Sequence, residues 1–72
     1  MGIEGRDRRF GVTAVEKGFI TVEQLFEAMK IQLREDIEKG EHRLIGTILF
    51  DMGVISLHQI DEVLEAMNVN ET

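Results

Sequence analysis

The chain lacks most of the residues that small proteins use to reinforce a minimal core. Its 72 residues contain no cysteine, no proline, no tryptophan and no tyrosine, and serine occurs only at Ser56. Without cysteine there is no disulfide framework and no thiolate metal site. A domain of this length lies near the lower limit for an independent hydrophobic core. We therefore expect helix packing to supply the stability. The near absence of alternating β-branched residues argues against a sheet.

Basic residues and long apolar runs are scarce as well. Eight lysine and arginine residues stand against fourteen aspartate and glutamate residues, so the net charge is −6. This balance lacks the positive footprint of a general nucleic-acid-binding protein. No apolar run is long enough to span a membrane, and the N-terminus has no signal-peptide core. We expect a cytoplasmic protein that binds no nucleic acid and inserts into no membrane.

The N-terminal residues carry the only concentration of positive charge. Arg6, Arg8 and Arg9 lie close together and form the one candidate anion site. The segment 3–6, Ile-Glu-Gly-Arg, also matches the recognition sequence of the protease factor Xa. Residues 1–6 are therefore left out of the fold prediction, and residues 1–8 are expected to form a flexible N-terminus.

Catalytic and metal-binding chemistry is poorly supplied. The single serine is predicted to cap a helix, and no nucleophile lies beside a base at a recognisable spacing. The two histidines, His42 and His58, have no matching ligands. Gly40 breaks the helix between Glu38 and the Glu41–His42 pair, which argues against a metal site there. We predict a protein that is not an enzyme and has no cofactor and no metal.

The chain does contain an internal repeat at a spacing of 35 residues. Residues 9–32 form the first copy, residues 33–43 a linker and residues 44–67 the second copy, together one helical domain. Glycines, helix caps and apolar positions recur, whereas surface residues differ. The matched pairs are Gly11 with Gly46, Gly18 with Gly53, Ile20 with Ile55, Thr21 with Ser56, Gln24 with Gln59, Leu25 with Ile60 and Met29 with Leu64.

Each copy predicts a short helix, a glycine stop and a second, capped helix. In the first copy the helix from Phe10 to Lys17 ends at Gly18, and Thr21 with Gln24 forms a capping box. The second copy repeats this pattern at Gly53, Ser56 and Gln59. The apolar pairs Ile20 with Leu25 and Ile55 with Ile60 are placed as hydrophobic staples across the two caps.

The longest predicted helix covers residues 22–39 and ends at Gly40. The last helix covers residues 57 to about 67, and residues 68–72 are expected to form a disordered tail. The sequence thus predicts an all-α fold of two similar helix-turn-helix hairpins, about four helices, packed around the long second helix.

Apolar residues cover about half the circumference of the long helix, more than one neighbouring helix requires. Either this helix is covered on two sides, or part of the arc is a surface for a partner. We expect Phe26, Leu33 and Ile37 to be its least protected apolar residues. Gln32 falls inside the arc, where an amide either reaches water at the domain edge or serves a binding site.

The first copy resembles a known motif. Arg9-Phe10-Gly11, Ala14, Gly18, Ile20-Thr21, Leu25, Met29 and Gln32 follow the spacing R-L-G-x-x-L-x-x-x-G-x-L-T-x-x-x-L-x-x-x-L-x-x-Q. This pattern resembles the N-terminal MshEN-type domain of type II secretion and type IV pilus assembly ATPases. That family carries two tandem copies, and its better-known members bind cyclic di-GMP.

The resemblance implies roles for six residues. Arg9 would pair with a phosphate or a guanine, next to Phe10, and Gly11 would let the backbone approach the ligand. Leu25 and Met29 would pack on the purine, and Gln32 would hydrogen-bond it.

The chain also departs from the motif. Leu44 stands where the second arginine belongs, with Arg43 one residue early, and Met67 replaces the second glutamine. Phe10 and Ala14 replace motif leucines, and the linker is longer than the family's usual spacer. Half of the polar ligand contacts are therefore missing.

Two kinds of binding function follow. The first is a protein-interaction or adaptor domain similar to the secretion-ATPase N-terminal domain, with an unidentified protein partner. The alternative is a cyclic di-GMP sensor that uses the first motif. A helix-turn-helix DNA reader is third, because the segment 57–67 carries acidic residues and no arginine or lysine.

Overall fold

The described part of the chain folds into four α-helices. The computed structural model describes the backbone of residues 5–71 and the side chains of residues 5–68. The helices are α1 (Gly5–Glu16), α2 (Val22–Lys39), α3 (Ile45–Asp51) and α4 (Leu57–Glu71). No strand occurs within residues 5–71. The all-α prediction is confirmed, and α2 is the longest helix, at about 27 Å for its length.

The helix boundaries between α1 and α4 form where the local sequence signals predicted them. Gly18 and Gly53 follow α1 and α3, and each has φ of 80°, a left-handed conformation that glycine adopts without steric cost. At the start of α2, the Thr21 hydroxyl accepts from the Gln24 N–H at 3.1 Å, and the Gln24 side chain accepts from the Thr21 N–H at 2.9 Å. The predicted capping box is therefore confirmed.

The second capping box has nearly the same geometry. Ser56 Oγ accepts from the Gln59 N–H at 3.1 Å, and Gln59 Oε1 accepts from the Ser56 N–H at 3.0 Å. Between the two halves, α2 ends at Gly40, whose N–H donates to the carbonyl of Glu35. The predicted breaks at Gly18, Gly40 and Gly53 are all present.

Both ends of the helical region extend further than predicted. The first helix begins at Gly5 and not at Phe10, so residues 5–8 are helical and do not belong to a flexible segment. The reason is long-range: Asp7 in the first turn of α1 is buried and bonded to a distant side chain. Helix α4 continues to Glu71, because residues 68–71 contain no glycine or proline to stop it. Residues 1–4 and 72 lie outside the described residues.

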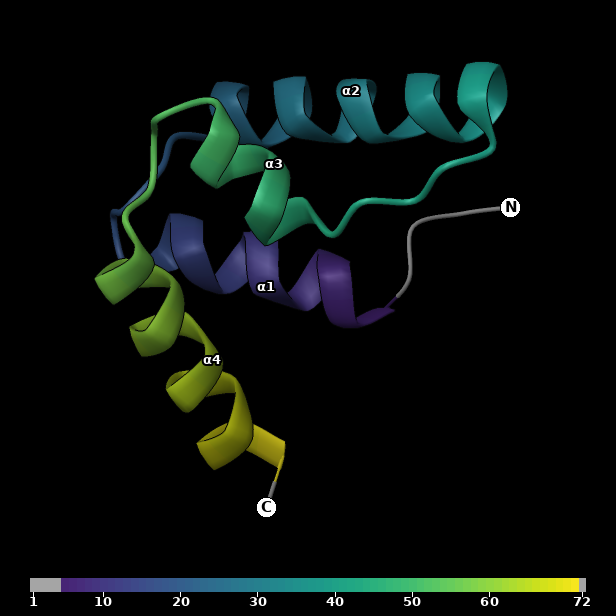
Figure 1. Ribbon diagram of the computed structural model, residues 1–72. Coiled ribbons are helices and arrows are strands. Elements are labelled where there is room, and N and C mark those ends of the chain that lie inside the picture. The colour runs from purple at the N-terminus through teal and green to yellow at the C-terminus, as the bar shows by residue number, and fades with distance from the viewer. Residues whose placement is uncertain (1–4, 72) are drawn as a thin grey trace.

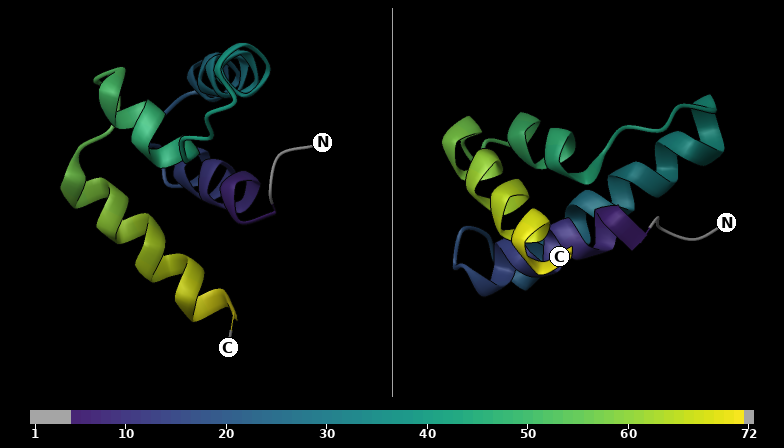
Figure 2. Two further views of the ribbon diagram at one scale, coloured as in Figure 1. Left: turned by 45° about the vertical axis from the view of Figure 1, so that its right-hand side comes forward. Right: turned by 90° about the horizontal axis from the view of Figure 1, so that it is seen from below.

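The packing order differs from the predicted one. Helices α1 and α3 lie in the centre, with α2 packed mainly on α3 and α4 packed on α1 (Figure 1). The left view of Figure 2 shows α2 and α4 on opposite sides of this central pair. The prediction that the fold packs around the long second helix is therefore wrong. Of the consecutive pairs, α1 and α2 meet at Leu25 over Gly11 and at the Gln32–Asp7 hydrogen bond, whereas α3 makes at most a marginal contact with α4.

The hydrophobic core is centred on α3. Its residues Ile45, Ile48 and Leu49 are at most 1% exposed. The short helix is thus covered on several sides, by α2 and by α1. Around it lie the other buried apolar side chains, namely Phe10, Ala14, Ile20, Leu25, Ala28, Ile55, Val63 and Met67. Among the described residues, no helix has the length and apolar character needed to cross a membrane.

Candidate functional site

Gln32 is buried and makes hydrogen bonds to two distant parts of the chain. Its side chain is 2% exposed, so it does not reach water at an edge. Its Nε2 donates to Asp7 Oδ2 at 2.9 Å and to the carbonyl of Arg43 at 2.7 Å. Both N–H groups are therefore used within the fold. Gln32 joins α1, α2 and the segment 40–44. Residues 33–39 of the predicted linker are part of α2, so from here on the linker means residues 40–44 only.

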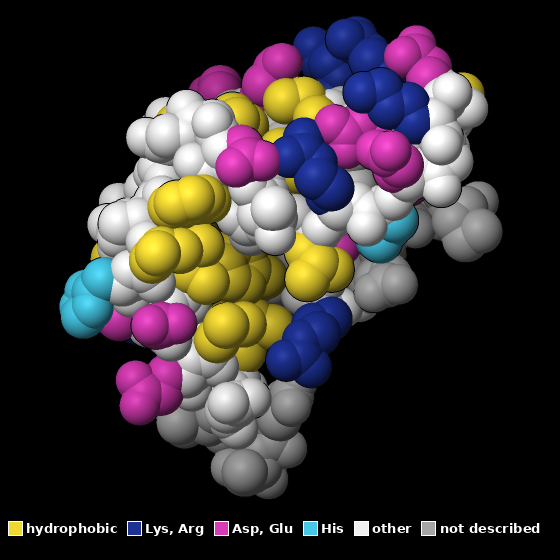
Figure 3. Space-filling model, viewed as in Figure 1, with side chains coloured by type: hydrophobic (Ala, Val, Ile, Leu, Met, Phe, Trp, Pro, Cys, Tyr) yellow, Lys and Arg dark blue, Asp and Glu magenta, His cyan; other side chains and the backbone are white. Residues whose placement is uncertain are grey.

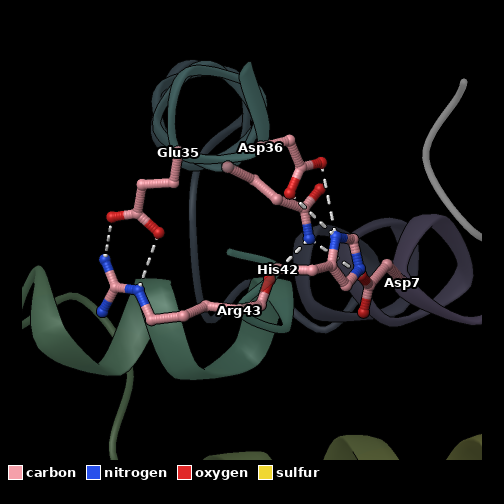
Figure 4. Close-up of polar contacts among 6 residues, drawn as sticks. Asp7, Glu35, Asp36, His42 and Arg43 are labelled. Atoms are coloured by element: carbon pink, nitrogen blue, oxygen red, sulfur yellow. Dashed lines mark hydrogen bonds and ion pairs between the residues drawn. The ribbon is translucent and has the colours of Figure 1, made fainter. Parts of the chain in front are cut away.

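The linker is fixed by further polar contacts on both sides (Figure 4). Arg43 donates Nε to Glu35 Oε1 at 3.0 Å and Nη2 to Glu35 Oε2 at 2.7 Å, and its Nη1 contacts Asp51. This bidentate contact lowers the pKa of Glu35 and raises the pKa of Arg43, chiefly through the shared hydrogen bonds. Arg43, which lies one residue before the motif position, therefore binds its own chain.

His42 points the other way from the linker. Its Nδ1 lies 3.2 Å from Asp36 Oδ1, and its Nε2 lies 3.6 Å from Asp7 Oδ2 (Figure 4). The ring thus sits between carboxylates of α2 and α1. Among the described residues, no group of three or more histidine, aspartate or glutamate side chains has an arrangement that could hold a metal ion. This polar cluster holds the linker in place and offers no unpartnered buried group to a ligand, since every buried side-chain nitrogen and oxygen described is hydrogen-bonded.

The six residues of the predicted ligand site do not converge on one cavity. Leu25 covers Gly11, so the space where a ligand would approach the backbone is filled by this leucine. Phe10 is buried and faces Gly46 on α3. Met29 is half-buried at the core margin. Arg9 alone is exposed, on the outer side of α1.

A groove opens instead between α3 and α4, with α1 as its floor. Both helices pack on α1, and they diverge from one another (Figures 1 and 2). Apolar side chains gather over this area on the surface (Figure 3). The residues that line the groove are Arg6, Asp7, Phe10, Leu44, Gly46, Thr47, Ile60, Leu64 and Met67.

The size of the groove limits what it can hold. Its volume is about 140 Å³. Pockets that enclose small-molecule ligands are typically about 300–1,000 Å³, whereas a cavity of about 150 Å³ takes a single benzene ring. Leu44 and Met67, which replace the motif arginine and glutamine, make its lining apolar. The groove suits one apolar side chain or ring and is too small to enclose a dinucleotide.

A second apolar surface lies on α2. Val22, Phe26, Leu33 and Ile37 are 45%, 61%, 55% and 74% exposed, whereas Leu25 on the same helix is 5% exposed. The expectation that Phe26, Leu33 and Ile37 are poorly protected is therefore confirmed. At 100° per residue the four exposed side chains fall within about 60° of one another, over a length of about 22 Å. We call this row the apolar stripe.

Charged residues line one margin of the apolar stripe. Glu23, Glu27, Lys30 and Arg34 are exposed and fall in the next sector of α2, about 60° wide. Lys30 Nζ lies 3.6 Å from Glu27 Oε1. We call these four residues the charged flank. The half-buried Met29 lies between the apolar stripe and the buried face of the helix.

Comparison with known proteins identifies no relative. No family model matches the chain, and neither a curated protein nor a solved structure does. A functional assignment therefore rests on the groove, the apolar stripe and the sequence motif.

Proposed function

We propose that this chain is a non-enzymatic protein-interaction module, an adaptor domain that binds a helix of a protein partner along the apolar stripe of α2. The main observation in support is that Phe26, Leu33 and Ile37 are more than half exposed on an otherwise well-packed helix. The stripe residues recur at spacings near four and seven, as in the seam of two packed helices. A contiguous apolar surface on a small acidic protein marks an interaction site.

The shape of the surface favours a helix as the occupant. The stripe is straight, narrow and about four turns long, so it matches the apolar face of one amphipathic helix. Within the described residues, α2 packs on α3 and α1, and the stripe side chains stay exposed (Figures 1 and 2). The resemblance of residues 9–32 to the secretion-ATPase N-terminal domain also supports a non-catalytic module.

Photocrosslinking in cells that make this protein tests the proposal. A benzophenone amino acid placed at Leu33 or Ile37 should give a covalent adduct of one defined mass. The same group at Glu38, an exposed position on the other side of α2, should not. Phe26→Glu should abolish the adduct, and circular dichroism should show that this variant remains helical. Equal adducts from Glu38, or none from the stripe, would overturn the proposal.

Exposed arginines favour cyclic di-GMP binding as the second candidate function. Arg6, Arg8 and Arg9 surround a shallow depression over the first turns of α1, in a chain that is otherwise acidic. Guanidinium groups suit a phosphodiester. This candidate ranks second because Gln32, Gly11 and Leu25 are occupied by contacts within the fold.

Amide NMR distinguishes the second candidate from the first. If the chain binds cyclic di-GMP, adding it should change the amide chemical shifts of residues around Arg9. Arg9→Ala should abolish these changes, and Lys17→Ala should retain them. The absence of changes at millimolar ligand would eliminate nucleotide binding and leave the interaction module untouched.

A further inference from the structure

We infer that the partner of the apolar stripe is a second copy of this chain, with the two α2 helices packed antiparallel. This inference rests on the proposed function, because it names the occupant of the same surface. Two features of α2 support it: the apolar residues are arranged symmetrically along the helix, and so are the charged residues beside them.

The apolar stripe is symmetric about its midpoint. Val22 and Phe26 lie on one side of Met29 and Lys30, and Leu33 and Ile37 lie on the other. When one α2 is reversed against another, Phe26 faces Leu33 of the second copy and Val22 faces Ile37. A two-fold interface requires a patch that is complementary to itself in this way.

The charged flank is complementary to itself in the same orientation. Its acidic residues, Glu23 and Glu27, occupy the N-terminal half, and its basic residues, Lys30 and Arg34, occupy the C-terminal half. In an antiparallel helix pair, the same margin of the apolar stripe lies side by side in the two copies, and the two margins run in opposite directions. The acidic half of each charged flank therefore meets the basic half of the other.

A parallel pair has no such match. There the charged flank of one copy lies beside the opposite margin of the second copy's stripe, where Met29 and Asp36 are found. Asp36 is already in contact with His42 of its own linker. The charge pattern thus selects the antiparallel arrangement.

The proposed interface is small, and we therefore expect the affinity between the two copies to be low. Stable complexes bury about 800 Å² per partner, and smaller interfaces associate weakly. One row of side chains on one helix provides less than this. Association should therefore depend on concentration, with monomers at low micromolar and dimers near millimolar protein.

Sedimentation velocity of the full chain over this concentration range tests the inference. The average mass should rise from that of a monomer to that of a dimer. Leu33→Glu should keep the chain monomeric throughout. Leu57→Glu is the matched control, because Leu57 is 63% exposed but lies on α4, and this variant should dimerise normally.

Charge reversal tests the antiparallel register. Glu23→Arg and Arg34→Glu should each raise the dissociation constant about 5- to 30-fold, the effect of one or two kcal/mol. The double variant should restore dimerisation, because Glu23 of one copy and Arg34 of the other face each other across the antiparallel pair and both charges are reversed. Reversals without effect would overturn the antiparallel register.

The two experiments separate this inference from the proposed function. An adduct of twice the chain mass supports both. An adduct with a different protein, from a chain that stays monomeric at millimolar concentration, upholds the interaction module and overturns self-association. A monomeric chain without any adduct overturns both.

Discussion

The side chain of Leu25 lies directly over Gly11, so that a Cβ atom on Gly11 would lie 2.5 Å from Leu25 Cδ1. The equivalent glycine of the second half, Gly46, is approached by a different residue: a Cβ there would lie 3.0 Å from Cζ of Phe10. The two glycines occupy matching sequence positions but contact side chains from different helices. Gly11 is contacted from α2, and Gly46 is contacted from α1.

Gly11→Ala should therefore cost stability where Gly46→Ala does not. Alanine gains about 1 kcal/mol of helix propensity over glycine, but overpacking costs about 1–3 kcal/mol. Leu25 is buried and must shift, whereas Phe10 borders the groove and has room to move. Urea unfolding should show Gly11→Ala to be less stable than Gly46→Ala by about 1 kcal/mol. Adding Leu25→Val should cost less in the Gly11→Ala background than in the wild type; equal costs would contradict the contact.

Gln32→Met should destabilise the fold by about 2 kcal/mol. The change removes the donor to the buried Asp7 carboxylate and to the Arg43 carbonyl, and bonds to charged groups are worth about 1.5–3 kcal/mol. Urea unfolding measures the loss. In an Asp7→Ala background the loss should fall to about half, because only the bond to Arg43 remains. Additive effects would show that Gln32 and Asp7 do not act together.

The Glu35–Arg43 pair should make the fold less stable in acid. Hydrogen bonding to Arg43 lowers the pKa of Glu35 below its ordinary value of 4.5. A lowered folded-state pKa means that the pair contributes fully above the unfolded-state value and is lost as the pH falls through the folded-state value. The free energy of unfolding, measured from pH 7 to pH 3, should therefore depend less on pH in Glu35→Gln. Glu38→Gln, an exposed change on the same helix, should leave the slope near that of the wild type.

The capping hydroxyls of Thr21 and Ser56 should contribute similar amounts to the free energy of unfolding. Thr21→Ala and Ser56→Ala each remove one acceptor for an otherwise unpaired backbone N–H, at a cost of about 1 kcal/mol. Thermal or urea unfolding of both variants checks this. Thr21→Ser should retain most of the stability. An unchanged midpoint in either alanine variant would mean that its helix does not depend on the hydroxyl.

The local sequence specified where helices end inside the chain, but not which helices pack against each other. Gly18, Gly40 and the two capping boxes act within a few residues, so the ends of helices at these positions could be read directly. The early start of α1 depends on Asp7 meeting Gln32 across 25 residues, which no local signal reports. The packing of α2 on α3 and of α4 on α1 likewise depends on contacts between distant segments.

The candidate site divides in the same way. The exposure of Phe26, Leu33 and Ile37 followed from helical periodicity, because the apolar arc is wider than one neighbour covers. The role of Gln32 could not be deduced, because its partners are a side chain of α1 and a carbonyl of the linker. The groove was missed because it results from the divergence of α3 and α4, although its residues Leu44 and Met67 had stood out as departures from the motif.

The crossed packing has a consequence for synthesis. Helix α1 leaves the ribosome before α2 and α3, yet α4, a helix that packs on it, follows both of them. A nascent chain that ends near Gly40 has formed α2 but lacks α3, the helix on which α2 packs. The apolar faces of α1 and α2 therefore stay partly uncovered until α3 and α4 have been made, and neither half can finish folding ahead of the other.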